Sequence, residues 1–317
     1  MNNKKKYRAL CTREITIPIF SRPWWLDAVC SGGEWDVCLV EKGEQILASM
    51  PYYSEKRFGL TYLVEPALTQ SLGPWIRTTQ LRHSKVLTQE KVLMEDLISQ
   101  LPTYDHFSQN WHYARTNWLP FYWKGFSQTT RYTYVIDDLT NLESVFSRFE
   151  HSKRKDIKKA EGIVGIYFDI SAEEFYENHR MTLAKQGAVI SYSMDHFRKI
   201  YDAGYANNSA VTIAAVDESN NLHAALFVVW DECSAYDLIS TIDPDFRTFG
   251  AASLLVREAI SYVSRKTKKF DFEGSMIESV ERSFRHFGAK QVPYFNIRRT
   301  PSLVLRTRAF TRNLYRW

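Results

Sequence analysis

The sequence predicts an α+β protein of two domains, with mixed β-sheets flanked by helices. Its 317 residues are enough for two domains of ordinary size. Segments of alternating apolar and polar residues, typical of strands, are interspersed with segments whose apolar residues recur every three or four positions, as in helices. In the second half the expected order is helices, three strands in a meander, a loop of small residues with a helix, and a final strand–helix–strand.

The first part of the chain, residues 1–136, is expected to mix strands and helices. Alternation predicts a hairpin from residues 35–40 and 45–53, with Gly43 in the turn. Apolar residues at helical spacing predict a helix over 88–101. The other predicted elements here are strands at 106–113 and 132–136.

A second unit is expected over residues 137–300. Helical spacing runs from residue 141 to 150 and continues as a basic segment from 151 to 161. The further predicted elements, in order, are a strand at 163–170, helices at 172–187 and 193–207, strands at 210–217 and 222–230, a strand beginning at 236, a helix at 250–266, a strand at 269–273, a helix at 277–287 and a strand at 291–299.

Composition indicates a soluble globular protein. Hydrophobic residues make up 44% of the chain and charged residues 24%, which is typical of a domain with a sizeable core. The longest apolar run, residues 224–230, is far too short to cross a bilayer, and no signal-peptide pattern follows the N-terminus. We therefore expect a cytoplasmic protein. The four cysteines have neither metal-ligand nor redox-motif spacing, so reduced thiols are expected.

The charge is distributed unevenly along the chain. The net charge is +5, but residues 1–8 hold four Lys or Arg and residues 298–317 hold six Arg, with no acidic residue in either end. Without these ends the chain carries 31 basic and 36 acidic residues. An acidic body argues against a general nucleic-acid binder, whose basic surface should lie on the folded body.

A loop of small residues lies between a predicted strand and a predicted helix. Its sequence is Arg247-Thr248-Phe249-Gly250-Ala251-Ala252. The first backbone N–H groups of a helix have no intrahelical acceptor and lie at the positive end of the helix dipole, so such a loop suits a pyrophosphate. Gly250 and the alanines would let a phosphate approach the backbone, and Arg247 can add charge. The same pattern also occurs where a helix packs tightly on a sheet.

Four segments together resemble known transferases. The loop 247–252 resembles the acyl-CoA binding loop of the GNAT acetyltransferases, Gln/Arg-x-x-Gly-x-Gly/Ala. Residues 152–162 resemble the Arg-x-x-Ile-x-Lys-Ala segment of FemA/FemX-type transferases. Phe270-Asp271-Phe272-Glu273-Gly274 resembles their Phe-Asp-Phe-Gly-Gly strand end, and residues 284–289 resemble their Phe-Lys-x-x-Phe-Gly segment. The match covers residues 140–297 well and residues 1–135 mainly in element order.

This resemblance implies two tandem GNAT-like domains with a cleft between them. Residues 1–136 would be a degenerate acceptor-side domain, 137–300 would carry the donor site, and the basic tail 301–317 would pack back on the first domain. As an alternative, a helix over 302–317 would place four apolar residues on one face, as in a helix lying on a membrane surface. These residues are Leu303, Phe310, Leu314 and Trp317.

The basic segment is a candidate substrate-binding helix. Like charges one turn apart repel mildly, and a phosphate-bearing partner would relieve that repulsion. In FemX-type enzymes the matching segment helps to hold the substrate's phosphates, which the resemblance extends to Lys153, Arg154, Lys155 and Lys158. A solvated helix face remains the alternative.

Acyl transfer to an amine needs a base, a donor for the developing oxyanion and stabilisation of the leaving thiolate. Glu273, at the end of a central strand, is the candidate base, and Asp237 is a comparable candidate on the strand beside the loop. Arg285 occupies the place of a family Lys implicated in stabilising transition-state charge, and Phe284 would line the same site. Many GNAT enzymes use a Tyr after this strand as the acid. Residues 277–288 contain none, so the acid is unassigned.

Other chemistries find little support. The chain lacks the common hydrolase, metalloprotease and P-loop motifs, and its histidines show no ligand spacing, so no metal is expected. The favoured function is an N-acyltransferase that uses acyl-CoA, with acetyl-CoA as the expected donor, and an amine on a cell-envelope or polysaccharide precursor as acceptor. The main alternative is an aminoacyl-tRNA-dependent transferase acting on a peptidoglycan precursor. The third is a non-catalytic GNAT-like scaffold.

Overall fold

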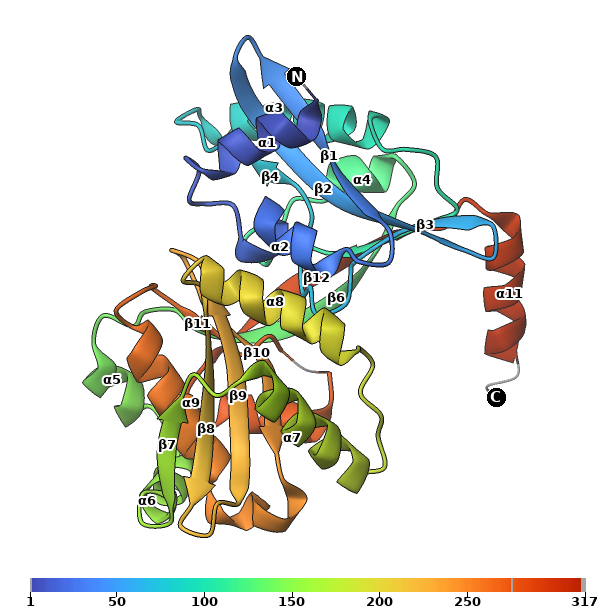
Figure 1. The fold of residues 1–317 in the computed structure, drawn as a ribbon. Helices are drawn as coiled ribbons and strands as arrows, with labels where there is room; N and C mark the ends of the chain where they lie inside the picture. Colours follow the sequence, from blue (N-terminus) through green and yellow to red (C-terminus); the bar gives the residue numbers. More distant parts are fainter. Residues whose placement is uncertain (1, 275, 315–317) are drawn as a thin grey trace. The chain divides into compact units, whose positions relative to one another are not determined.

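The computed structural model describes residues 2–274 and 276–314, and these fall into two compact units (Figure 1). The first unit comprises residues 1–131 and 293–317, and the second comprises residues 132–292. The chain passes between the units inside two strands, β6 (Ser127–Ile136) and β12 (Lys290–Arg299). The expected boundary after residue 136 falls at the end of β6. Residues 293–300, expected in the second domain, belong to the first unit.

The first unit is built on a mixed sheet in the order β1-β2-β3-β5-β12-β6. β1 and β2 form the predicted hairpin, whose turn contains Gly43 at a φ of 61°. β3 and β5 are parallel, whereas β5 pairs with β12 antiparallel. The bounds are β1 (Glu34–Lys42), β2 (Gln45–Arg57), β3 (Leu60–Val64), β4 (Trp75–Ile76), which pairs with β2, and β5 (His106–Asn110).

One helix of the first unit, α3 (His83–Ser99), contains most of the predicted helix 88–101. Its buried side chains, Leu93, Met94 and Leu97, pack in a core with Phe107 and Trp111. The first unit also contains helical elements that were not predicted from the sequence. These are α1 (Asn3–Cys11), a 3-10 helix (Ile19–Ser21), α2 (Pro23–Val29) and α4 (Leu119–Trp123).

The tail forms α11 (Leu303–Leu314). Leu303 and Val304 are exposed on it, as are Arg306 and Arg308. Of the apolar face expected for a membrane-surface helix, the side chains of Phe310 and Leu314 and all of Trp317 lie outside the described residues. Both the packing of the tail on the first domain and the surface helix stay predictions.

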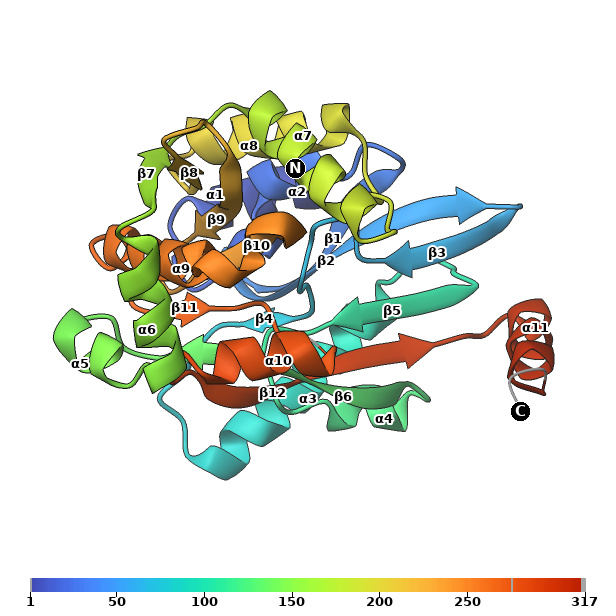
Figure 2. The ribbon, with the colours of Figure 1, turned by 90° about the horizontal axis from the view of Figure 1, so that it is seen from below.

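The second unit is a sheet in the order β6-β11-β10-β9-β8-β7 with helices on both faces (Figure 2). Alternate residues of β9 establish the two faces. Phe227 packs against Phe175 of α7 (Ala172–Lys185) and Phe197 of α8 (Met194–Ala206), whereas Leu226 belongs to the same core cluster as residues of α9 (Ala251–Val263). The strands are β7 (Val164–Phe168), β8 (Ala210–Asp217), β9 (Leu222–Trp230), β10 (Ala235–Ile242) and β11 (Phe270–Asp271).

The helices of the second unit follow the predicted order, with one break. The predicted run from 141 to 161 divides into α5 (Leu142–Ser147) and α6 (His151–Ala160), because Phe149 turns inward onto Phe287 and the Glu150 N–H donates to the carbonyl of His286, 2.9 Å away. The others are α7 (Ala172–Lys185), α8 (Met194–Ala206), α9 (Ala251–Val263) and α10 (Glu278–Arg285).

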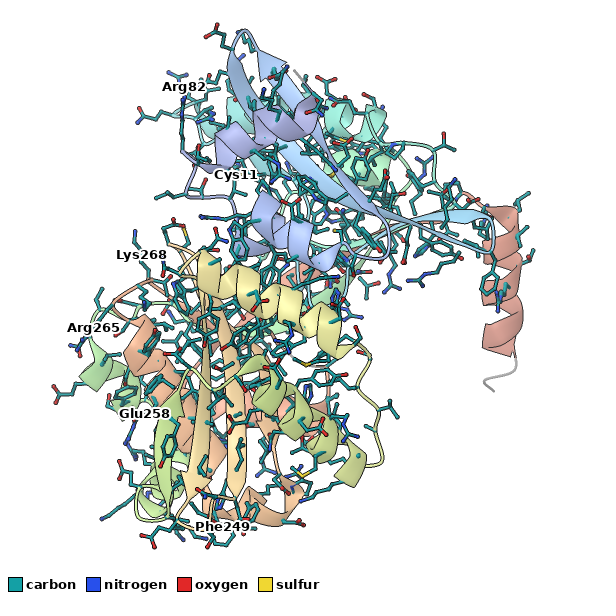
Figure 3. All side chains as sticks on the ribbon, in the orientation of Figure 1. Cys11, Arg82, Phe249, Glu258, Arg265 and Lys268 are labelled. Atoms are coloured by element: carbon teal, nitrogen blue, oxygen red, sulfur yellow. The ribbon has the colours of Figure 1, made fainter. Side chains whose placement is uncertain are left out.

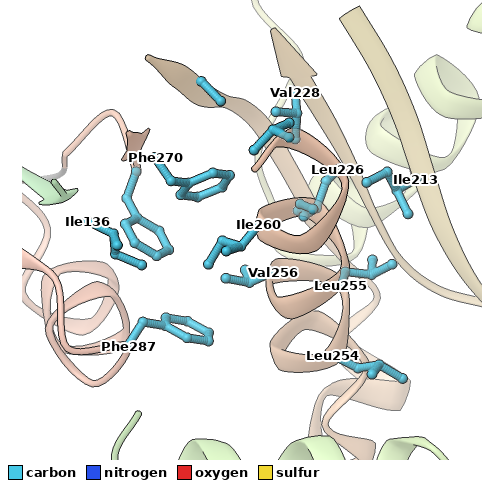
Figure 4. Packing of buried hydrophobic residues seen from close by; sticks show 14 of the residues in the cluster. Ile136, Ile213, Leu226, Val228, Leu254, Leu255, Val256, Ile260, Phe270 and Phe287 are labelled. Carbon is cyan, nitrogen blue, oxygen red and sulfur yellow. The ribbon is translucent and has the colours of Figure 1, made fainter. Parts of the chain in front are cut away.

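Helix α9 lies at the centre of the larger core. Leu254, Leu255, Val256 and Ile260 are buried along it, and Figure 4 shows Val256 and Ile260 directed toward Phe270 and Phe287. Serines cap α7 and α8: the hydroxyl of Ser171 accepts from the N–H of Glu174, and that of Ser193 accepts from the N–H of His196. Among the described residues no side chain caps α9, whose N-cap position is Gly250.

Candidate functional site

The pairing of β10 and β11 ends within two residues. These parallel strands are in register only at Ala235–Phe270 and Tyr236–Asp271. On the other side of β10, the pairing with β9 shifts register between Asp237 and Ile239, so Leu238 is skipped in the register. Two of the predicted catalytic residues, Asp237 and Glu273, lie at this point of the sheet.

The structure brings three carboxyl groups together there. Asp237 and Asp271 are buried, at 5% and 4% exposure, and Glu273 is half-buried. The hydroxyl of Ser240 donates to Asp237, with 2.8 Å to each carboxylate oxygen. Asp271 accepts hydrogen bonds from the Thr133 hydroxyl and from the Glu273 backbone N–H, the latter at 2.8 Å. Sequence reasoning named Glu273 and Asp237 but missed Asp271 and its partner Thr133.

The pKa values of all three carboxyl groups are raised. Burial raises the pKa of Glu273 well above its ordinary value, and the charges of Asp271 and Asp237 raise it further. Burial also raises the pKa of Asp237 and of Asp271 to about 6, against the hydrogen bonds that favour their charged forms. A raised pKa makes the ionised form of Glu273 a stronger proton acceptor than an ordinary carboxylate, which suits acid–base chemistry.

Glu273 is held in an unusual backbone conformation. Its φ is 63°, in the left-handed region that a residue with a side chain rarely adopts. Gly274 follows at a φ of 66°, and a Cβ on it would lie 2.2 Å from the carbonyl oxygen of Tyr132. This close approach to β6 explains the glycine. A strained residue at the end of a central strand, anchored by Asp271, is typical of a functional position.

The raised pKa of Asp237 predicts a pH-dependent effect of Asp237→Asn. At pH values between the ordinary pKa of Asp237 and its raised pKa, the folded protein keeps a proton on Asp237 that the unfolded chain releases. The contribution of Asp237 to the free energy of unfolding is therefore complete below pH ~4 and is lost as the pH rises through about 6. Asparagine does not ionise. At pH 7 we therefore expect Asp237→Asn to unfold with a free energy higher than the wild type by about 3 kcal/mol, with no difference at pH 4.

Urea unfolding at the two pH values measures this difference. Asp195→Asn is the control, since the Asp195 side chain is 75% exposed on α8 and its replacement should leave the pH profile of stability unchanged. Parallel pH profiles for wild type and Asp237→Asn would contradict the prediction.

The small-residue loop begins as a 3-10 helix, Pro244–Phe249, and continues through Gly250 into α9. Arg247 and Thr248 are exposed, Phe249 and Ala252 are half-buried, and Ala251 is buried. Gly250 has a φ of 85°, and a Cβ on it would lie 2.4 Å from the carbonyl oxygen of Asp156 in α6. The side of Gly250 on which a side chain would project is thus filled by the backbone of α6.

The basic helix α6 lies directly against this loop. The ammonium of Lys159 donates to the carbonyl of Thr248 at 2.9 Å and lies 5.1 Å from the centre of the Phe249 ring. Figure 3 shows Phe249 at the same end of the second unit as this helix. The loop and the basic segment, predicted as separate features, therefore lie in contact. Arg154, Lys155 and Lys158 are exposed on α6, and Arg154 also donates to the carbonyl of Ser147.

Lys153 connects α6 to two further helices. Its ammonium lies 2.8 Å from the hydroxyl of Ser283 on α10, 3.5 Å from that of Ser253 on α9, and 4.4 Å from the ring centre of Phe287. Burial lowers the pKa of Lys153, and only the charge of Asp156 opposes this. A cation beside the positive end of α9, held by hydroxyls, is electrostatically unfavourable until an anion joins it. The arrangement therefore suits a phosphate.

The remaining predicted residues lie on α10. Arg285 is exposed and pairs with Glu281 at 3.7 Å, one turn earlier in the same helix. Glu281 also accepts a hydrogen bond from the buried Tyr134 hydroxyl at 2.5 Å. Phe284 packs on Phe272, with ring centres 5.0 Å apart. Thus the contacts of Arg285 are with Glu281, while Phe284 supports the strand that carries the acids.

Comparison with solved structures identifies the fold. FemX superposes with a TM-score of 0.65 at 10% identity, over 92% of this chain and 95% of FemX. The chain has a tandem GNAT-like, FemX-type fold. A tandem GNAT protein from the clavulanic acid biosynthesis pathway (TM-score 0.52, 9% identity, 93% of this chain and 94% of that one) and L-PGS from Bacillus licheniformis (0.53, 12%, 95% and 98%) are also similar. No family model and no curated protein matches the sequence.

The FemX-type fold was predicted from the sequence and is confirmed. At identities of 9–12% the likeness establishes the fold and leaves the individual site residues as predictions. Within residues 2–274 and 276–314, no three His, Cys, Asp or Glu side chains are arranged to hold a metal ion. In the same part of the chain, every helix is too short or too polar to cross a bilayer.

Proposed function

We propose that this protein is an N-acyltransferase that moves an acyl group from acyl-CoA to an amine on a cell-envelope or polysaccharide precursor. The contact of α6 with the start of α9 carries the proposal. Lys153 and Lys159 both contact residues close to the start of α9, which has no side-chain cap, and Ser253 and Ser283 add hydroxyl donors. Backbone N–H groups, a helix dipole and two ammonium groups are what a pyrophosphate requires.

The acid cluster supplies the chemistry of this reaction. The amine nitrogen attacks the thioester carbonyl, its new bond to carbon forms, and the carbon–sulfur bond breaks to release the CoA thiolate. The proton lost by the nitrogen passes to Glu273 and is available to the thiolate, whose conjugate acid has a pKa of about 8.5 by analogy with cysteine. The backbone N–H of Leu238, at the register shift, is the proposed donor to the oxyanion.

One observation favours an aminoacyl-tRNA as the alternative donor. Arg154, Lys155 and Lys158 leave more exposed positive charge on α6 than one pyrophosphate requires, and a polyanion would use it. Binding of tRNA would then weaken steeply with salt. A scaffold without catalysis would bind ligand at the same place but release no thiol with any amine acceptor.

The test is calorimetric binding of CoA and acetyl-CoA to wild type and to Lys153→Met. The substitution keeps most of the side-chain volume and removes the charge, so we expect about 10–100-fold weaker binding, the usual contribution of a charge-assisted hydrogen bond. Folding stability should be kept or slightly increased, because a desolvated ammonium is removed.

Lys199→Met on α8, where Lys199 pairs with Asp195 at the surface, is the matched control and should bind CoA like wild type. Absence of CoA binding in wild type would contradict the acyl-CoA donor and favour charged tRNA. Equal binding by wild type and Lys153→Met would show that the phosphates lie elsewhere.

A further inference from the structure

The short helix α4 presents an apolar face to solvent. Leu119, Tyr122 and Trp123 are spaced i, i+3 and i+4, so they share one side of the helix, and they are 50%, 58% and 54% exposed. Pro120 and Phe121, on the other side, are buried in the core of the first unit. Three large apolar side chains exposed together on one helix indicate a surface that binds a protein or a membrane.

The neighbouring helix α3 extends this apolar surface. Leu81, just before the helix, and Val92, three turns later, are each 52% exposed. They line an open groove of about 550 Å³ together with Leu47 of β2 and the side chains of Lys42 and Lys85. Thr88, Gln89 and Leu93 complete the lining, so apolar side chains and two lysines line the same groove.

The two helices form one surface. The ammonium of Lys91 on α3 lies 5.3 Å from the ring centre of Trp123, and Lys124 pairs with Glu95 at 3.7 Å. Figure 2 shows α3 and α4 side by side in the first unit. We use the name α3–α4 patch for the apolar residues Leu81, Val92, Leu119, Tyr122 and Trp123 with the cations Lys42, Arg82, Lys85, Lys91 and Lys124.

The charge on this patch is predominantly positive. Lys42, Arg82, Lys85 and Lys91 are exposed, and Figure 3 shows Arg82 at the outer surface. The acids of α3 are mostly engaged. Glu90 turns inward to the guanidinium of Arg115, at 2.6 Å, and to the amide of Asn117, at 2.8 Å. Glu95 is paired with Lys124, and Asp96 lies toward the opposite end of the helix from Arg82.

We propose that the α3–α4 patch docks on an anionic membrane surface. Tryptophan and tyrosine have an apolar body and a polar tip, which suits the headgroup level of a bilayer, and lysines around them reach lipid phosphates. The positive charge of the patch makes a lipid surface a better match than a second copy of the same patch, which would repel it. The proposal is independent of the proposed function, because all of these residues lie in the first unit and the acid cluster lies in the second.

Cosedimentation of the full chain with vesicles tests the proposal. We expect binding to phosphatidylcholine vesicles that contain phosphatidylglycerol, little binding to phosphatidylcholine alone, and weakening of the binding as salt is added. Tyr122→Ser/Trp123→Ser should abolish the binding. Lys85→Gln/Lys91→Gln should weaken it about fivefold per lysine removed. Tyr167→Ser, which removes a 56% exposed tyrosine from β7, is the control and should bind like wild type.

Each contrary result overturns the proposal in a distinct way. Absence of binding to the anionic vesicles, or equal binding by all variants, would show that the patch does not meet lipid. Concentration-dependent dimerisation of wild type that Tyr122→Ser/Trp123→Ser abolishes would show that a second copy covers the patch. Circular dichroism of each variant confirms that its fold is kept, and the lysine variant tests the patch without altering its apolar residues. CoA binding should be unchanged in all of them.

Discussion

Glu273→Gln is expected to lower kcat by about 10²–10⁴-fold while leaving the KM for the acyl donor almost unchanged, if Glu273 is the base of an acyl transfer. Glutamine keeps the shape of the side chain but cannot accept the proton of the amine. The donor phosphates are assigned to α6 and α9, so their binding should not depend on this carboxyl group. Initial rates of thiol release from acyl-CoA with an amine acceptor measure the effect.

The control for this prediction is Glu278→Gln on the exposed first turn of α10, which should keep the wild-type rate. A kcat for Glu273→Gln within a few-fold of wild type would exclude Glu273 as the base. Asp237→Asn would then be the next variant to assay, because Asp237 is the other predicted base and its charge raises the pKa of Glu273.

Gly250→Ala is expected to destabilise the second unit by about 2–4 kcal/mol. Two costs add: a left-handed conformation for a residue with a Cβ, and a clash of that Cβ with the backbone of Asp156, 2.4 Å away. The clash would lie between the backbones of α6 and of the start of α9, so it can be relieved only by moving the two helices apart. Urea or thermal unfolding measures the loss.

Gly187→Ala is the matched control for the clash. Gly187 lies in the same unit with a φ of 72°, and its Cβ would have no atom within 4 Å, so only the conformational cost of about 1 kcal/mol applies. Equal losses in the free energy of unfolding of the two variants would show that α6 moves away from residue 250 without destabilising the protein. The comparison also explains why a bulky residue at position 250 is a poor probe of CoA binding: it would displace α6 whether or not a phosphate binds there.

Long elements with a strong pattern were predictable from the sequence, and short ones were not. β8 and β9 have their predicted bounds because each is a continuous apolar segment ended by polar turn residues. β4 has two residues and α4 has five, too few to show any period. β11 is shorter than the predicted strand 269–273, since Glu273 and Gly274 adopt positive φ values that end the pairing.

The candidate site was predictable in its parts but not in its assembly. Local pattern and resemblance pointed to the loop 247–252, the basic segment, Asp237 and Glu273. The contact between Gly250 and Asp156 could not be predicted from a local sequence pattern, because the two residues are 94 positions apart. For the same reason Ser253 and Ser283 were missed as partners of Lys153. Asp271 is part of the strand-end motif, but its position beside Glu273 is evident only from its buried contacts with Thr133 and Glu273.

The second unit is inserted in the sequence of the first, and this determines the order in which the two units can fold. Residues 132–292 are continuous and contain all the partners of their own sheet, so this unit can complete itself as soon as it has left the ribosome. The first unit must wait, because β5 pairs with residues 296–299 of β12, almost 190 positions later in the chain. Until then β5 has an unpaired edge, so a nascent chain that stops near residue 292 should hold one finished unit and one open sheet prone to aggregation.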